Sequence, residues 1–186
     1  AGLCPRADVI SIEKYSEAKG KLQPGDAIAS VTINTDTKRH PTCDGLRDML
    51  LSAGDKGEKV SLSIVRDGKT IDIKDLSTVK LKEGGHGLGI RPDYDADSAI
   101  IGAVLPGSAA DRAGIAVVDS SDAQVTKLGD EPVSSFHDIR RILAHAKPGK
   151  MSITLKSDAG EQVFQLPVTQ KEIDQARTIL QRSRDV

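Results

Sequence analysis

The residues Val60-Ser-Leu-Ser-Ile-Val-Arg-Asp-Gly-Lys-Thr-Ile-Asp-Ile73 alternate between apolar and polar side chains on both sides of an Asp-Gly pair. Alternation with a period of two is typical of a half-buried β-strand, and Asp-Gly between two such runs favours a tight turn. The pattern therefore predicts a β-hairpin. It recurs in Met151-Ser-Ile-Thr-Leu-Lys-Ser-Asp-Ala-Gly-Glu-Gln-Val-Phe-Gln-Leu166, so the chain contains the same motif twice.

A helical pattern precedes each hairpin, over Cys43–Ala53 and over Phe136–Ala146. In each segment, three apolar residues with i, i+3, i+4 spacing share one helical face. They are Leu46, Met49 and Leu50 in the first segment, and Ile139, Ile142 and Leu143 in the second. We expect Ser134 or Ser135 to cap the second helix and Gly54 to end the first.

A shared pattern also lies upstream of each helix. Ala99–Ile115 predicts a strand, a Pro-Gly turn and one helical turn capped by Ser108. In the first half, Asp8–Ile12 predicts the strand and Tyr15–Gly20 the helical turn. Leu22–Val31 then predicts a tight turn that leads into a buried strand. The chain is therefore a duplication of one unit of strands and short helices.

The polar, glycine-rich Lys80–Gly85 marks the expected boundary between the halves. We predict a first domain over 1–78, a second over 86–168 and a helical tail over 169–186. The fold class is mostly β with short helices (α+β), as two tandem partly open β-barrels or sandwiches with two helices each. In the tail, Glu172–Arg182 carries a narrow apolar stripe that predicts a docked helix.

Composition narrows the class of function. The 186 residues are 38% hydrophobic and 28% charged, which is typical of a globular chain, and the net charge is -1. This near-neutral balance and the 2% of aromatic residues argue against binding of nucleic acid or an acidic membrane surface. The basic clusters Lys38-Arg39-His40 and Arg140-Arg141 are short, so we interpret them as solvated surface.

No apolar run is long enough to span a bilayer, so we expect this chain to be soluble. The chain starts at Ala1 rather than Met, and we expect it to be a fragment of a longer protein. The four histidines have no ligand spacing with cysteines or carboxylates, which predicts no metal site. Cys43 and His40 are close in sequence but lack an orienting partner, so we predict no catalytic residue.

The most specific motif is His86-Gly87-Leu88-Gly89-Ile90. Glycines let consecutive backbone N–H groups curl around an anion such as a peptide's terminal carboxylate. A strand that starts at Ile90 would present an edge to which an extended peptide can add. Gly87, Leu88, Gly89 and Ile90 are therefore candidate peptide-binding residues. The alternative interpretation is that they are only the buried start of a strand.

This loop, followed by Val104–Gly114 and the shared order of elements, resembles bacterial PDZ domains over residues 2–168. The resemblance implies two PDZ-like domains that bind peptide C-termini or extended segments by β-augmentation. In the first half, Gly2-Leu3-Cys4-Pro5 takes the place of the loop, which adds Gly2, Leu3 and Cys4 to the candidates. Two stretches depart from the PDZ pattern, namely the long Asn34–Thr42 and Ala116–Ala123, where Pro-Gly-Asp is usual.

The PDZ resemblance also suggests a second wall for the groove. Phe136, Arg140 and Leu143 share one helical face, which could lie opposite the Ile90 strand. Alternatively, Phe136 and Leu143 belong to the core, and Arg140, as we favour, is solvated. In the first half, Cys4 on the groove-edge strand would face Cys43 on the groove helix. A disulfide could close that groove, although two unpaired thiols are the interpretation that we favour.

Two tandem units with Leu88-Gly-Ile-Arg-Pro92 at the second opening resemble the periplasmic region of RseP-type site-2 intramembrane metalloproteases. This resemblance implies a non-catalytic substrate filter on the extracytoplasmic face of the inner membrane, with polypeptide as its partner. The zinc and its His-Glu-x-x-His motif would lie in membrane helices outside this chain, which itself needs no cofactor. Two alternatives remain: the C-terminal PDZ pair of an HtrA-type serine protease, and a PDZ scaffold in secretion or envelope assembly.

Overall fold

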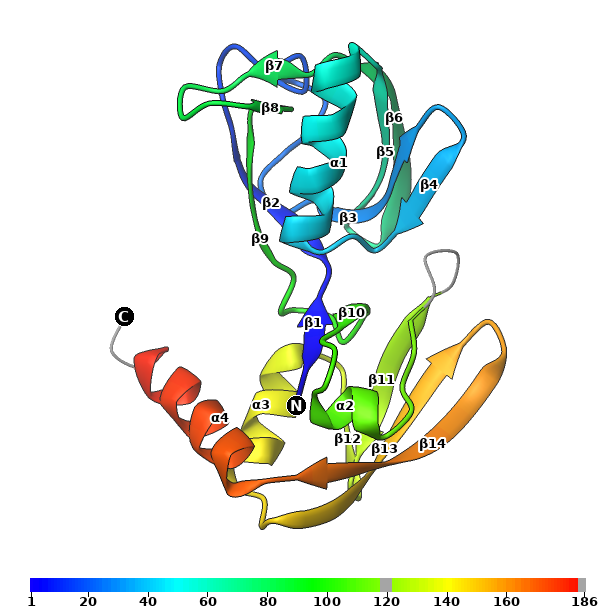
Figure 1. Ribbon diagram of the computed structural model, residues 1–186, viewed down its shortest axis with the longest axis vertical. Coiled ribbons are helices and arrows are strands. Elements are labelled where there is room, and N and C mark those ends of the chain that lie inside the picture. Colours follow the sequence, from blue (N-terminus) through cyan, green and yellow to red (C-terminus); the bar gives the residue numbers. More distant parts are fainter. Residues whose placement is uncertain (118–121, 184–186) are drawn as a thin grey trace. The chain divides into compact units, whose positions relative to one another are not determined.

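A computed structural model describes residues 1–117 and 122–183 (Figure 1). The chain divides into two compact units. One, which we call the continuous unit, is Arg6–Asp95. The other, the discontinuous unit, joins Ala1–Pro5 to Ala96–Val186. The continuous unit is thus inserted into the sequence of the discontinuous one. Both units combine antiparallel strands with helices, and the expected α+β class is confirmed.

One antiparallel sheet forms the frame of the continuous unit. Its strand order is β6-β5-β3-β2-β9, and β4 pairs with β3. The strands are β2 (Ala7–Ile12), β3 (Ala27–Ile33), β4 (Asp36–Arg39), β5 (Val60–Arg66), β6 (Lys69–Leu76) and β9 (Ile90–Tyr94). Helix α1 (Cys43–Lys56) packs on this frame, and Ile28, Leu46 and Ile64 are buried in the aliphatic core.

The hairpin predicted from Val60–Ile73 is confirmed as β5–β6. Arg66 pairs with Lys69, so Asp67 and Gly68 alone form the turn. Both turn residues have positive φ, 50° and 73°. This is the backbone that a two-residue type I′ turn requires, and it explains the Asp-Gly pair.

Helix α1 starts as its sequence suggests but ends later. The Thr42 hydroxyl caps it by accepting the Gly45 N–H at 3.1 Å. The prediction that Gly54 ends the helix is wrong, because α1 continues to Lys56 and stops at the left-handed Gly57. A Cβ on Gly54 would lie 2.1 Å from the Cβ of His86. Gly54 therefore serves close packing against His86 and does not terminate the helix.

The helical turn predicted over Tyr15–Gly20 does not form. The segment consists of turns, and α1 is the one helix of residues 6–95, all of which the structure describes. The Ser16 hydroxyl accepts the Ala18 N–H at 3.0 Å and bonds to the Leu88 carbonyl. A serine that bonds to a nearby backbone group competes with helix formation. The expectation of two helices per unit is therefore wrong for this unit.

The expected linker Lys80–Gly85 belongs to a small hairpin whose loop is residues 81–85. Strand β7 (Val79–Lys80) pairs with β8 (His86–Gly87), and the Leu81 N–H donates to the Gly85 carbonyl at 3.0 Å. This hairpin returns the chain to α1. As a result β9 completes the sheet of the continuous unit, and residues 86–95 do not open the second domain as predicted.

The N-terminal strand β1 (Leu3–Pro5) joins the other unit, where it pairs with β10 (Ile101–Val104). Only Arg6 separates β1 from β2, and a chain reversal needs at least two residues. β1 therefore cannot pair with β2 while β2 keeps its own length. The predicted boundaries 1–78 and 86–168 are wrong for this reason, since each unit takes one edge strand from beyond the expected boundary.

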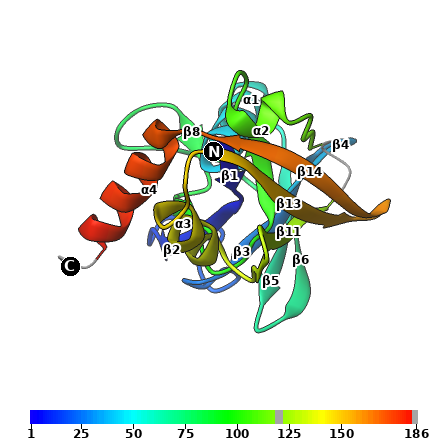
Figure 2. The same ribbon diagram turned by 90° about the horizontal axis from the view of Figure 1, so that it is seen from below.

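The discontinuous unit contains a four-stranded antiparallel sheet in the order β12-β11-β13-β14. The bounds are β11 (Ala123–Leu128), β12 (Glu131–Pro132), β13 (Gly149–Ser157) and β14 (Gly160–Val168). The second predicted hairpin is thus confirmed as β13–β14, whose long ribbons Figure 2 shows side by side. The unusual stretch Ala116–Ala123 falls partly outside the described residues.

The described residues of the discontinuous unit form three helices: α2 (Ala109–Arg112), α3 (Phe136–Ala144) and α4 (Gln170–Arg182). Ser108 caps α2 and Ser135 caps α3, as predicted. The tail helix α4 lies beside α3 (Figures 1 and 2). Its Ile173 and Ala176 are buried in the unit's core, and its Arg177 donates to the Ala144 carbonyl at the end of α3 at 2.8 Å. The tail is therefore an integral part of this unit.

Candidate functional site

The loop before β9 is shaped by two bonds of its carbonyl groups. The Leu88 carbonyl accepts the Ser16 hydroxyl, and the Gly89 carbonyl accepts the Glu13 N–H at 2.7 Å. Gly89 has φ +63°, and a Cβ there would lie 3.0 Å from the Ser16 Cβ. Only glycine satisfies both conditions without strain. The Leu88 side chain is buried in the core, so the loop backbone is fixed.

The carbonyl groups of Leu88 and Gly89 are both hydrogen-bonded, whereas no described residue accepts a hydrogen bond from the backbone N–H of either residue. The N–H of Ile90 points away from β2, because bonding direction alternates along a strand and Gly89 bonds toward β2. Three successive N–H groups therefore lack a partner in the part of the chain that the structure describes, which is the arrangement that binds an anion.

A groove of about 380 Å³ opens beside this loop. One wall is α1 and the other is β9, which runs alongside the helix in Figure 1. The residues of α1 that line it follow i, i+3, i+4, i+7 spacing and are Cys43, Leu46, Arg47 and Leu50. Leu46, Leu50 and Leu88 are all at most 5% exposed and form an apolar floor. An extended apolar segment with an anionic end fits this combination.

Charged groups surround the apolar floor. Arg47, Lys82 and Arg91 contribute positive charge, and Glu13 and Glu83 negative charge. The two signs nearly balance, so the groove has no strong preference for an acidic or basic segment. The fixed feature for an anion is therefore the row of backbone amides.

The Cys43 thiol lies at the end of the groove near β9 and is not a nucleophile. Burial, followed by the negative charges of Asp93, Asp44 and Asp8, raises the pKa of Cys43 to about 11. At neutral pH the group is therefore a small, weakly polar thiol. His40, its neighbour in sequence, bonds to Arg6 through Nδ1 at 3.1 Å. The interpretation of Cys43 and His40 as a chance adjacency agrees with this geometry.

The prediction from sequence assigned one wall of the groove to a helix of the wrong unit. Phe136 and Leu143 are 3% and 4% exposed and belong to the core of the discontinuous unit. Arg140 lies on the same helix, α3, whereas the loop Gly87–Ile90 faces α1. The three residues therefore do not line this groove. The residues missed were those of α1, although the pattern Leu46, Met49, Leu50 had already marked that helix.

Gly2, Leu3 and Cys4 are not part of this groove, because they belong to the discontinuous unit, where Leu3 and Cys4 pair with β10. Gly2 nevertheless repeats the geometry of Gly89. It has φ +87°, its carbonyl accepts the Leu105 N–H at 2.8 Å, and a Cβ would collide with the Ser108 side chain. The prediction that Cys4 faces Cys43 across one groove is wrong, and no disulfide joins these two described cysteines.

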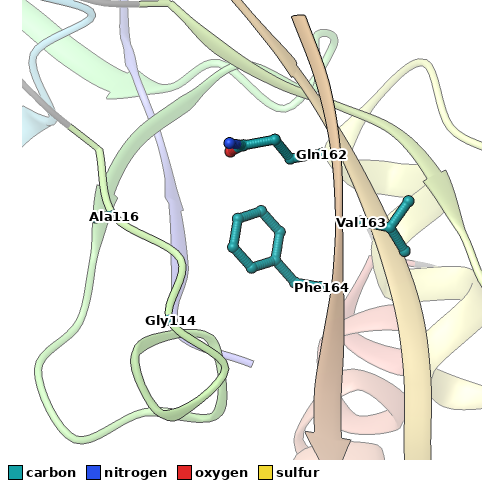
Figure 3. Close-up of a pocket in the computed structure, with 5 residues that line it drawn as sticks. All are labelled: Gly114, Ala116, Gln162, Val163 and Phe164. Atoms are coloured by element: carbon teal, nitrogen blue, oxygen red, sulfur yellow. The ribbon is translucent and has the colours of Figure 1, made fainter. Parts of the chain in front are cut away.

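The discontinuous unit has a hollow of its own, shown in Figure 3. Gln162 and Phe164 point from β14 toward Gly114 and Ala116, while Val163 points to the other side of the strand. Among the described residues, Gln162 is the one polar side chain in this lining. A single amide gives little basis for ligand recognition, so the groove of the continuous unit is the stronger candidate.

No protein-family model matches this chain, and the comparison with curated proteins found no match. Among residues 1–117 and 122–183, no three His, Cys, Asp or Glu side chains are close enough to hold a metal ion together. In that same part of the chain, none of the helices has the length and apolar character needed to cross a membrane.

Proposed function

We propose that the continuous unit binds the C-terminal end of an extended polypeptide in the groove between β9 and α1. The observation that carries the proposal is the row of N–H groups at Leu88, Gly89 and Ile90, which have no partner among the described residues and lie at one end of an apolar groove. A terminal carboxylate would satisfy all three amides, and the peptide behind it would run along β9. The resemblance to PDZ domains supports the same mode of binding.

The floor of the groove defines the last residue of the ligand. Leu46, Leu50 and Leu88 offer only apolar atoms beside the amides. A terminal Val, Leu or Ile buries its side chain there, and complete burial of such a side chain is worth about 1.5–3 kcal/mol. The nearly balanced charges at the mouth predict weak selection on the residues before it.

A titration of the ¹⁵N-labelled chain tests this proposal. The probes are acetylated hexapeptides that end in Ala-Ala-Val, Ala-Ala-Leu or Ala-Ala-Ile, each with a free carboxylate and as the C-terminal amide. We expect the free acids to shift the amide signals of Leu88, Gly89 and Ile90, and the amides to bind at least tenfold more weakly. Equal binding of acid and amide would remove the role of the loop.

For the protein as a whole, we propose that this module belongs to an RseP-type site-2 metalloprotease and filters substrates on the extracytoplasmic side of the membrane. The support is the resemblance of the tandem units and of Leu88-Gly-Ile-Arg-Pro92. The zinc of such an enzyme would lie in its membrane helices. Cleavage of long and trimmed substrates, with and without this segment, tests the filter. Identical cleavage in both cases would refute it.

A further inference from the structure

The outer edge of β9 can be assigned from its bonds to β2. The Gly89 carbonyl accepts from Glu13 at one end, and the Asp95 N–H donates to the Arg6 carbonyl at 2.8 Å at the other. Both groups therefore point toward β2. Because direction alternates along an extended strand, the backbone groups of Ile90, Pro92 and Tyr94 point the opposite way. β9 is the last strand of its sheet, so this outer edge is the one that meets the groove.

Pro92 interrupts the donors of that edge. Proline has no N–H, and its ring carbons occupy the place where the hydrogen would point. Within the groove, the outer edge therefore offers carbonyl acceptors at Ile90 and Pro92 but only one strand donor, the Ile90 N–H. That donor lies beside the loop amides of Leu88 and Gly89. All the donors for a ligand are thus gathered at the end where a carboxylate would sit.

The same interruption exists in the discontinuous unit. Gly2 bonds toward β10, so Leu3 and Pro5 point outward by the same alternation. The two pairings also share their register. Ile90 pairs with Ile12 and Pro92 with Val9, while Leu3 pairs with Val104 and Pro5 with Ile101. Both repeats therefore carry proline at the second outward position of the edge strand.

We propose that Pro92 withholds one hydrogen bond from any chain that adds to β9, so that the affinity of the groove comes mainly from the loop amides that hold the carboxylate, an inference that rests on the proposed function. A segment that adds to β9 needs a donor opposite each of its carbonyls that faces the strand, and Pro92 withholds the second donor. A C-terminal segment satisfies its carboxylate at the loop and exchanges bonds with Ile90. The residue two positions before its end then donates its N–H to the Pro92 carbonyl, and that residue's own carbonyl receives no bond.

The experiment compares two forms of the acetylated hexapeptide that ends in Ala-Ala-Val with a free carboxylate. In the second form, an ester replaces the amide bond between the third-last and second-last residues. The ester weakens the carbonyl that faces Pro92, and it removes an N–H that points away from β9. We expect the native chain to bind both forms with the same affinity within about twofold. A loss of more than threefold for the ester would overturn the inference, and this measurement needs no variant.

The variant Pro92→Ala restores the missing N–H. A net hydrogen bond changes affinity by about two- to tenfold, so we expect P92A to bind the all-amide peptide more tightly by that factor and to lose the gain with the ester. P92A should also gain affinity for the same peptide when it is extended beyond its valine and amidated. Pro5→Ala changes the equivalent residue in the other unit, and should leave binding at the Leu88–Ile90 amides unchanged.

The outcomes separate the two proposals. If no free-carboxylate peptide binds the native chain, the proposed function itself fails. If the free acid binds and its amide does not, but P92A binds acid and ester as the native chain does, only the role of Pro92 is refuted. The amide spectrum of P92A without peptide shows whether the groove has kept its structure.

Discussion

The continuous and discontinuous units build the same pair of strands and use it differently. In both units, a glycine with positive φ precedes the edge strand, which is β9 in one unit and β1 in the other. β9 pairs with β2 in the same register in which β1 pairs with β10. In the continuous unit, the helix α1 leaves Cys43 partly exposed beside that strand. In the discontinuous unit, Phe136 and Leu143 of α3 are buried in the core, and α4 packs against α3. The strand motif is thus shared, and the two units differ in the helices that pack beside it.

The largest expected effect concerns the ends of the continuous unit. Arg6 Nε lies 2.8 Å from Asp95 Oδ2, and both side chains are less than 10% exposed. Asp95→Asn would leave a buried guanidinium without its counter-charge, which costs about 3–5 kcal/mol of unfolding free energy. Urea unfolding followed by amide signals of each unit would measure it. The control is Glu131→Gln at the exposed Arg141 pair of the other unit, which should cost less than about 1 kcal/mol. Equal losses would contradict the comparison.

The next effect tests whether the tail helix is needed by the discontinuous unit alone. Ile173 is fully buried, so Ile173→Ala should cost about 2–4 kcal/mol through lost packing and a cavity. Ile179 on the same helix is 42% exposed, and Ile179→Ala should cost less than about 0.5 kcal/mol. The same unfolding experiment applies. If signals of the continuous unit shifted their midpoint as much, the two units would not be independent in stability.

A smaller effect is expected at the close contact between α1 and His86. A glycine inside a helix usually gains stability when it is changed to alanine. Gly54→Ala should instead lose about 1–3 kcal/mol, because the new methyl would overlap His86. Ser52→Ala, on the exposed side of α1, should be neutral or slightly stabilising. The melting temperatures of the two variants compare them directly, and a stabilised G54A would show that His86 moves away without cost.

The smallest effect on stability comes from the groove cysteine. In a Cys4→Ser background, Cys43 should react with iodoacetamide at pH 8 about a hundredfold more slowly than in urea, because two pKa units separate the folded and unfolded thiols. The pKa of the Cys43 thiol is higher in the folded chain than in the unfolded chain, so the thiol is protonated in both below about pH 9. Between about pH 9 and 11 the unfolded chain loses its proton first, and stability falls. A Cys43→Ala variant should not show this loss, and rapid alkylation at pH 8 would contradict the burial.

Local patterns predicted most elements of the fold because their causes are local. Alternation and a turn dipeptide specify each hairpin, and Ser135 and the apolar spacing specify α3. Local patterns do not show which unit β9 joins. Either of the two edge strands, β1 or β9, could pair with β2 or with β10 in the same register. The decisive fact is geometric, since one residue between β1 and β2 leaves no room for a reversal.

Only one of the two sides of the candidate site could be predicted from the sequence. The Gly87–Ile90 loop can be predicted from the sequence, because its glycines are required by the local backbone conformation. The opposite wall depends on which unit β9 joins, so α3 was chosen where α1 is correct. Gly54 shows the same limit, because a glycine required by a distant neighbour has the same sequence signal as one that ends a helix.

The insertion of the continuous unit has a consequence for biosynthesis. Ala1–Pro5 leaves the ribosome well before Ile101–Val104, its partner strand, has been translated. At an elongation rate of about 5–20 residues per second, β1 waits roughly 5–20 s. All of Arg6–Asp95 becomes available during that interval, so the inner unit can close on itself, with Arg6 held by Asp95, before the outer unit exists. Translation order thus favours assembly from the inside outward, since β10 is translated only after the whole inner unit.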